Sequence, residues 1–174
     1  MNILIVGSGA RESAFIWKLS QSRKNINIFS INPNAGAQEL STPIYTQKED
    51  LKFIKSKVID LKIDMVLVGP EIPLINGIQD YLKKDPITKE TAVIVPSKKG
   101  AKLEGSKDFA KNFMQKYNIP TAKYRSFSQA QIQEGLDYLE TIKPPYVLKA
   151  DGPASGKGVL IIDNIIEAKT QLEE

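Results

Sequence analysis

One stretch of the sequence carries most of the argument about fold: Tyr146-Val-Leu-Lys-Ala-Asp-Gly-Pro-Ala-Ser-Gly-Lys-Gly-Val-Leu-Ile-Ile-Asp163. Two short apolar runs flank a loop that contains three glycines and no bulky side chain. Apolar runs of this length, bounded by turn residues, are typical of β-strands. We therefore predict a hairpin whose two strands are joined by a glycine-rich loop.

The composition of this loop favours anion binding. Glycines let consecutive backbone N–H groups turn toward one ligand, and Lys149 and Lys157 add positive charge. A P-loop is excluded, because Gly152 and Gly156 are too close together, Gly158 replaces the hydroxyl residue, and a strand follows where a P-loop continues into a helix. The alternative is a plain surface hairpin with solvated lysines. The position of Lys149 within an apolar run argues against it, because an unpaired charge there is costly.

The composition also limits the chemistry. The chain has 174 residues, 41% of them hydrophobic and 25% charged, which is typical of a globular protein. Cysteine and histidine are absent, so thiol nucleophiles, disulfides and imidazole metal sites are excluded. A metal would need carboxylates and phosphates, which favours magnesium. No basic tract, signal peptide or membrane-length apolar run is present, so we expect a cytoplasmic protein with no nucleic acid or membrane partner.

The first part of the chain alternates strand and helix patterns. We predict strands at 2–6, 26–31, 63–68 and 91–95, with helices at 12–22, 50–60 and 74–83 between them. We expect the first helix to turn Ala14, Phe15 and Leu19 inward. Strands separated by helices of this length predict an α/β fold, with a parallel sheet covered on both faces. We assign a Rossmann-like domain to residues 1–96, in which ligands are expected at the carboxyl ends of the strands.

Three polar loops follow the first three predicted strands. The first, Gly7-Ser-Gly-Ala-Arg-Glu12, resembles a dinucleotide fingerprint, but a glutamate takes the place of the third glycine, and no acidic residue follows the second strand to hold a ribose. We therefore do not expect NAD. A helix N-terminus with Arg11 beside it suits a sugar phosphate; the alternative is a tight turn with Arg11 in solvent. The other two loops are Asn32-Pro-Asn-Ala-Gly36 and Gly69-Pro-Glu-Ile-Pro73.

The second part of the chain begins after a polar, glycine-interrupted segment that we assign as a linker, residues 97–105. Ser106 is a predicted N-cap for a helix at 107–116 whose inner face is expected to be apolar, with Phe109, Ala110, Phe113 and Met114 inward. A short strand is predicted at 122–125. A capping box at Ser128 predicts a helix before the hairpin, and Asn164 predicts another after it.

Several of these motifs, in this order, resemble the phosphoribosylamine–glycine ligase family of ATP-grasp enzymes. They are the loop at 7–12, the Gly-Pro-Glu at 69–71, the segment Leu103-Glu-Gly-Ser-Lys-Asp-Phe-Ala-Lys-Asn-Phe-Met114 and the hairpin loop from Lys149 to Val159. This chain departs from the family in two places. Ser13 stands where the family has histidine, and the second loop lacks the first glycine of the family's Pro-Gly-Asn-Ala-Gly.

The resemblance implies an ATP-dependent carboxylate-amine ligase of purine biosynthesis. ATP, with Mg²⁺ or Mn²⁺, would phosphorylate glycine, and the amine of 5-phosphoribosylamine would displace the phosphate to give glycinamide ribonucleotide. The residues expected to bind nucleotide are Lys107, Lys149, Gly152, Ser155, Gly156, Lys157 and Gly158. The residues expected to bind the phosphoribosylamine, on weaker grounds, are Gly9, Arg11, Asn34, Gly69, Pro70 and Glu71.

The family places its metal ligands downstream of the hairpin. We therefore interpret the chain as an N-terminal fragment, with residues 106–174 forming most of the first ATP-grasp subdomain, and expect the fragment alone to be inactive. Two alternatives remain open on sequence grounds: a standalone nucleotide-binding module, and another ATP-grasp carboxylate-amine ligase. The Gly-Ser-Gly-x-Arg-Glu and Gly-Pro-Glu loops favour the glycine ligase over the latter.

Overall fold

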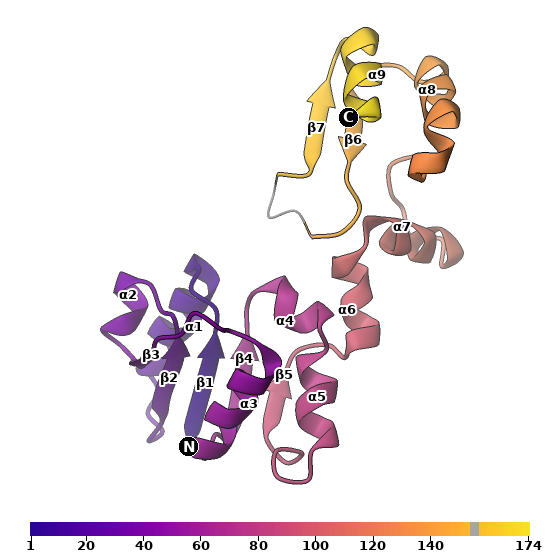
Figure 1. The fold of residues 1–174 in the computed structure, drawn as a ribbon. Helices are drawn as coiled ribbons and strands as arrows, with labels where there is room; N and C mark the ends of the chain where they lie inside the picture. The colour runs from indigo at the N-terminus through magenta and orange to yellow at the C-terminus, as the bar shows by residue number, and fades with distance from the viewer. Residues whose placement is uncertain (154–156) are drawn as a thin grey trace. The chain divides into compact units, whose positions relative to one another are not determined.

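The computed structural model describes residues 1–153 and 157–174, and its contacts divide the chain into two compact units, 1–104 and 105–174 (Figure 1). The first unit contains a five-stranded sheet in the order β3-β2-β1-β4-β5, with every neighbouring pair parallel. Its strands are β1 (Asn2–Val6), β2 (Asn27–Ile31), β3 (Thr42–Ile44), β4 (Met65–Val68) and β5 (Ala92–Ile94). The prediction of a parallel α/β fold is confirmed.

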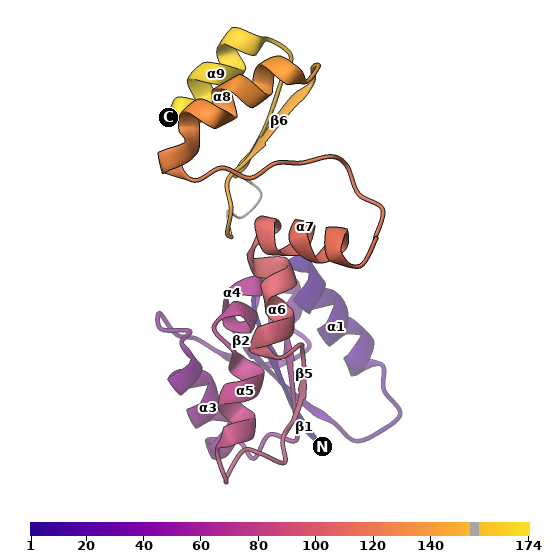
Figure 2. The ribbon, with the colours of Figure 1, turned by 90° about the vertical axis from the view of Figure 1, so that its right-hand side faces the viewer.

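Helices cover both faces of this sheet, as Figure 2 shows for α1 on one side and α3 and α5 on the other. The helices of the unit are α1 (Ala10–Ser20), α2 (Ala35–Gln38), α3 (Leu51–Asp60), α4 (Glu71–Ile75), α5 (Ile78–Lys84) and α6 (Lys98–Gly105). The central strand β1 is buried on both sides: Leu4 and Val6 pack with α3 and α5, whereas Ile3 and Ile5 pack with α1. This two-sided burial explains why β1 is continuously apolar instead of alternating.

The buried face of α1 differs from the prediction. The helix begins at Ala10, two residues earlier than expected, and its buried residues are Glu12 and Ile16. Ala14 and Phe15 are exposed, and Phe15 keeps 39% of its accessible surface, whereas Leu19 packs partly buried against Ile16 and its neighbours as expected. Glu12 lies one turn before Ile16 on the face that packs on the sheet, and this places a carboxylate next to the strand ends.

Two segments predicted to be irregular are helical. The loop predicted at 69–73 ends at Pro70, and α4 begins at Glu71 with Pro73 in its first turn, where proline is tolerated. The segment predicted to be a linker, 97–105, is mostly α6. Its start is stabilised by Asp80, which accepts a hydrogen bond from the Lys98 amide at 2.6 Å, and its Ala101 is buried. These tertiary contacts outweigh the low helix propensity of the two glycines.

The second unit contains α7 (Lys107–Lys116), the short 3-10 helix η1 (Gln129–Gln131), α8 (Ile132–Thr141), β6 (Tyr146–Lys149), β7 (Val159–Ile162) and α9 (Ile165–Glu173). The predicted hairpin is confirmed: β6 and β7 pair antiparallel. Its inner face packs on α8 and α9 around Leu139, Tyr146, Ile162 and Ala168. The capping box at Ser128 and the caps at Ser106 and Asn164 are also confirmed.

The structure differs from two predictions for this unit. Residues 122–125 form no strand, and the described sheet of this unit contains β6 and β7 only. The expected inward face of α7 is only partly covered: none of its ten residues is buried and Phe109 is 38% exposed, but Ala110, Phe113 and Met114 are half-buried. Across the described parts of the chain, we find no helix with the length and apolar character needed to span a bilayer.

Candidate functional site

The order of the sheet places a crevice at the carboxyl end of β1. The chain leaves β1 for β2 on one side, and β4 lies on the other side, so the loops after β1 and β4 diverge from adjacent strand ends. Val6 and Val68 are paired, and the Gly69 amide donates a hydrogen bond to the Val6 carbonyl at 3.1 Å. This is where open parallel sheets bind their ligands.

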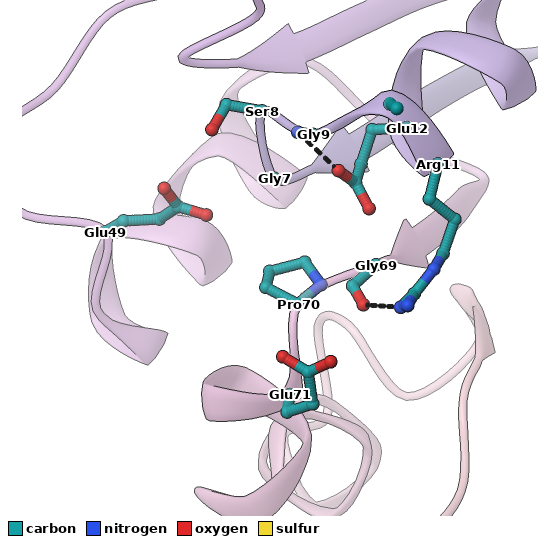
Figure 3. Close-up of a pocket in the computed structure, with 10 residues that line it drawn as sticks. Gly7, Ser8, Gly9, Arg11, Glu12, Glu49, Gly69, Pro70 and Glu71 are labelled. Atoms are coloured by element: carbon teal, nitrogen blue, oxygen red, sulfur yellow. Dashed lines mark hydrogen bonds between the residues drawn. The ribbon is translucent and has the colours of Figure 1, made fainter. Parts of the chain in front are cut away.

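A pocket of about 410 Å³ opens at this point (Figure 3). Its lining comes from the first loop, the start of α1, the third loop and one residue before α3: Gly7, Ser8, Gly9, Ala10, Arg11, Glu12, Glu49, Gly69, Pro70 and Glu71. Five of the six residues predicted to bind the sugar phosphate are in this list, the exception being Asn34.

Close approach of the two loops requires glycine at two positions. Gly7 has a φ of +112°, which a side chain would strain, and a Cβ there would lie 2.6 Å from Cδ of Pro70. A Cβ on Gly69 would lie 1.4 Å from Oε1 of Glu12. Position 69 therefore requires glycine, because the Glu12 carboxylate occupies the space that a side chain would need.

Arg11 bonds the first loop to the third, and Glu12 is held within the first. Glu12 is only 5% exposed, and its Oε2 accepts a hydrogen bond from the Gly9 amide at 2.6 Å. Arg11 donates from Nη1 to the Gly69 carbonyl, also at 2.6 Å. Arg11 remains exposed, as the alternative interpretation expected, but one nitrogen of its guanidinium is held by the Gly69 carbonyl. From the sequence we considered Glu12 only as the residue that breaks a fingerprint; the burial of its carboxylate was missed.

The second loop is bonded to the first through Asn34. Its Nδ2 donates to the Ser8 carbonyl at 2.9 Å, and its Oδ1 accepts from the Ala37 amide at 3.1 Å, which caps α2. Ser13, at the position where the family has histidine, donates from Oγ to Oδ1 of Asn34 at 2.8 Å. Asn34 thus holds the loop at Ser8 and Gly9 through hydrogen bonds to its backbone carbonyls.

Glu49 lines the pocket and was also missed. It follows β3, a strand of three residues with Pro43 at its centre that no periodicity in the sequence revealed. Partial burial raises the pKa of the Glu49 carboxyl; a hydrogen bond from Asn32 opposes this, and the nearby charge of Glu12 adds to the increase. Glu12 and Glu49 both line the pocket.

In the second unit, the start of the hairpin loop is bonded to the start of α7. Asp151 accepts hydrogen bonds from the amide of Lys107 at 2.6 Å and from Oγ of Ser106 at 3.0 Å. Lys107 donates from Nζ to the Gly152 carbonyl at 2.8 Å. Two predicted nucleotide-binding residues, Lys107 and Gly152, are therefore in direct contact although they lie 45 positions apart.

The other predicted nucleotide-binding residues differ in their surroundings. Lys149 is exposed at the end of β6, opposite Val159, so the expected penalty for a charge within an apolar strand does not apply. Lys157 is exposed, and the Gly158 carbonyl accepts a hydrogen bond from the Ala150 amide at 2.9 Å. Ser155 and Gly156 lie outside the described residues.

ATP chemistry usually implies a divalent cation. Among residues 1–153 and 157–174, no group of three or more acidic side chains is arranged to hold a metal ion. These residues do not fit a Mg²⁺ or Mn²⁺ site, so we assign no step to a metal here.

Taken in order along the chain, the two units define a class of protein: a Rossmann-like unit followed by the first part of an ATP-grasp domain. Residues 1–104 match the model for the phosphoribosylglycinamide synthetase N domain, and residues 105–174 match the model for the ATP-grasp (A) domain of the same enzymes. The chain belongs to the phosphoribosylglycinamide synthetase family.

Individual relatives agree with this membership. The chain is 42% identical to the phosphoribosylamine–glycine ligase of Caldanaerobacter subterraneus over 99% of its own length and 41% identical to that of Fusobacterium nucleatum over all of it. A solved phosphoribosylamine–glycine ligase from Thermotoga maritima matches 98% of the chain with a TM-score of 0.72 and 30% identity. The chain spans 40%, 39% and 38% of these three proteins, respectively.

Proposed function

We propose that these residues form the sugar-phosphate-binding unit and the beginning of the ATP-binding unit of an ATP-dependent ligase that joins glycine to 5-phosphoribosylamine. The observation that carries the proposal is the pocket at the carboxyl ends of β1 and β4. It is lined by Gly9, Arg11 and the Gly-Pro-Glu loop, in a unit that matches the N domain of the family. Because the chain spans about two fifths of its relatives, the activity is proposed for a protein of their length.

The proposed reaction has two steps. An oxygen of the glycine carboxylate attacks the γ-phosphorus of ATP, giving glycyl phosphate and ADP. The amine nitrogen of 5-phosphoribosylamine then attacks the glycyl carbonyl carbon, the C–O bond to phosphate breaks, and the nitrogen loses a proton. The products are glycinamide ribonucleotide, ADP and phosphate. The protein has to offset negative charge on the transferred phosphoryl group and keep water from the acyl phosphate.

Within this chain, the first unit would position the amine. The amides at the start of α1 and the guanidinium of Arg11 suit the phosphate of the sugar, because a helix N-terminus attracts anions. In the second unit, Lys107 and Lys149 would offset charge on the nucleotide phosphates. The bond from Lys107 to the Gly152 carbonyl supports this role, since it holds the ammonium group beside the hairpin loop.

The location is part of the proposal. The absence of cysteine suits a reducing compartment, and the substrates are small metabolites, so we place the activity in the cytoplasm.

Replacing Lys149 by methionine tests the nucleotide assignment. In a protein of the relatives' length, we expect Lys149→Met to lower kcat/KM for ATP by roughly 100-fold or more, because the substitution removes a positive charge that would offset the charge of the phosphoryl group. The measurement is phosphate release that depends on both glycine and 5-phosphoribosylamine. Lys143→Met, an exposed lysine of the same unit outside the proposed site, is the matched control. If Lys149→Met stays within a few fold of the unmodified protein, the assignment of Lys149 is wrong.

A further inference from the structure

The charge of the pocket is unusual for a phosphate site alone. Three of its lining residues are carboxylates, namely Glu12, Glu49 and Glu71, and its one cationic side chain, Arg11, already donates to the Gly69 carbonyl. Carboxylates repel a phosphate and accept hydrogen bonds from hydroxyl or amine groups. The pocket therefore has acceptors for a part of the ligand other than its phosphate.

One of these acceptors is held in place and left open. Glu12 is only 5% exposed, and its Oε2 is held by a hydrogen bond from the Gly9 amide. Its Oε1 accepts no hydrogen bond from the described residues, and none of their buried side-chain oxygens is unpaired, so Oε1 retains access to solvent. Figure 3 shows this oxygen turned away from Gly9, in the pocket that Glu12 lines.

A carboxylate in this part of a Rossmann-like unit has a familiar chemical use. Dinucleotide-binding domains hold the ribose hydroxyls with an acidic residue after the second strand. In this chain the second strand ends at Ile31 and is followed by Asn32, so that acceptor is missing. Glu12 offers a carboxylate from the first helix instead, beside the loops that we propose for the sugar phosphate.

We propose that Oε1 of Glu12 accepts a hydrogen bond from a ring hydroxyl of the sugar phosphate, with Glu49 as a second acceptor, so that the pocket selects ribose over deoxyribose. This inference rests on the proposed function, since it names the group that the same pocket recognises. The phosphate stays with the start of α1 and Arg11, and the carboxylates face the ring.

The expected selectivity follows from the burial of Glu12. A sugar that lacks the hydroxyl leaves a largely buried carboxylate oxygen without a donor after water is displaced. Sites built to bond a hydroxyl therefore discriminate strongly against analogues without it. Because Oε1 keeps some solvent, we expect a modest preference for ribose, roughly tenfold.

The test is calorimetric titration of the 174-residue chain with ribose 5-phosphate and with 2-deoxyribose 5-phosphate. We expect the unmodified chain to bind ribose 5-phosphate roughly tenfold more tightly. In Glu12→Gln, the Gly9 amide holds the side-chain oxygen, and the NH₂ group then faces the sugar, so the preference should fall to about twofold or less. Glu90→Gln, which removes an exposed carboxylate outside the pocket lining, should keep the full preference.

The possible results separate this inference from the proposed function. If the unmodified chain binds both sugars equally well, or if Glu12→Gln keeps the tenfold preference, Glu12 does not read the hydroxyl, while the proposed function stands. If the chain binds neither sugar phosphate, the pocket assignment fails and the inference with it. The comparison of the two sugars on the unmodified chain needs no substitution, so it holds even if Glu12→Gln does not fold.

Discussion

The approach of Glu12 to Gly69 determines the shape of the pocket at the scale of single residues. The Glu12 carboxylate lies where a side chain at position 69 would project, and the Gly9 amide prevents it from moving freely. The glycine after β4 is thus needed for a specific neighbour and not for an unusual backbone angle. A substitution at Gly69 should act on the pocket through Glu12.

We expect Gly69→Ala to destabilise the first unit by about 1–3 kcal/mol, because the new methyl group displaces a buried carboxylate. The same change should weaken binding of ribose 5-phosphate. The measurement is urea unfolding followed by the fluorescence of Trp17, the single tryptophan of the chain, together with calorimetric titration.

Gly36→Ala is the matched control, because the nearest atom to a Cβ there is 3.9 Å away and the residue lies in α2. It should be neutral or stabilising by up to about 1 kcal/mol. Equal losses in both variants would show that Glu12 does not limit position 69.

Asn34 combines two functions that two substitutions can separate. Asn34→Ala should cost about 1–2 kcal/mol, because it removes the cap of α2 and the bond to the Ser8 carbonyl. Asn34→Asp keeps an acceptor for the Ala37 amide but loses the donor to Ser8. We therefore expect Asn34→Asp to retain the stability of α2 and to weaken sugar-phosphate binding. Unfolding by urea and titration with ribose 5-phosphate measure the two effects, and an identical profile for both variants would contradict this division.

Some pocket residues could be predicted from the sequence and others could not. Arg11, Gly69 and Glu71 were accessible because they lie within a few residues of the end of a strand with a strong apolar signal, and parallel strands bring their carboxyl ends together. Glu49 was not accessible, because it depends on β3, whose three residues include a proline and have no periodic signal. The burial of Glu12 was not accessible, because the apolar residues Ala14, Phe15 and Leu19 indicated a different inner face from the one that contains Glu12 and Ile16.

At the scale of elements, α7 is attached to the rest of its unit by hydrogen bonds at its first turn. None of its ten residues is buried, and hydrogen bonds at its first turn join it to the hairpin loop. Asp151 accepts from the amides of Lys107 and Asp108, groups that have no partner within the helix itself. Asp151 therefore determines where Lys107 lies relative to Gly152.

We expect Asp151→Ala to lower the hydrogen-exchange protection of the Lys107 and Asp108 amides roughly fivefold, since they lose their acceptor. NMR measurement of amide exchange on the 174-residue chain tests this directly. Protection at Ile166, which Asn164 caps in α9, is the internal reference and should not change. Unchanged protection at Lys107 would mean that Asp151 does not hold α7.

The same contact predicts a pH dependence. Partial burial by itself would raise the pKa of Asp151, but hydrogen bonds from the backbone of Asp108, the side chain of Ser106 and the backbones of Lys107 and Gly152 outweigh it and hold the pKa below its ordinary value of 3.8. A lowered folded-state pKa means that the stabilisation is complete above the unfolded value and disappears as the pH falls through the folded one. Protection at Lys107 should therefore persist at about pH 5 and decrease only once the pH has fallen below 3.8, the ordinary pKa of the group; in Asp151→Asn this step should be absent.

Element boundaries depended on tertiary contacts that the sequence does not display. The caps at Ser106, Ser128 and Asn164 were predicted correctly because capping is local. The segment that forms α6 was predicted to be a linker. Its stability depends on the hydrogen bond that the Lys98 amide donates to Asp80 and on the burial of Ala101, and both involve residues remote in sequence. The strand predicted at 122–125 was wrong for a related reason, since a local apolar pattern does not determine whether a segment pairs with a sheet.

At the scale of the whole molecule, the chain consists of two units with different proposed ligands. We propose the sugar phosphate as the ligand of residues 1–104 and the nucleotide as the ligand of residues 105–174, the two ranges that the family models match. The overall assignment was accessible from the sequence because four spaced motifs agree in order with one family. No single motif, including the hairpin loop, was specific enough alone.

We predict that the 174-residue chain binds ATP weakly and does not turn it over. It spans about two fifths of its relatives, and its described residues offer no cluster of acidic side chains for a metal. Calorimetry with ATP and a phosphate-release assay with glycine and 5-phosphoribosylamine test this. Sub-micromolar affinity for ATP, or release of product, would contradict the prediction.

The central claim is that the pocket formed by the loops after β1 and β4 binds a phosphorylated sugar. Its most direct test is an NMR titration of the 174-residue chain with ribose 5-phosphate. We expect the largest amide shift changes between Gly7 and Glu12 and at Gly69 and Glu71, the backbone positions that line the pocket. Changes that centre on residues 105–174, or no changes at millimolar sugar phosphate, would contradict the claim.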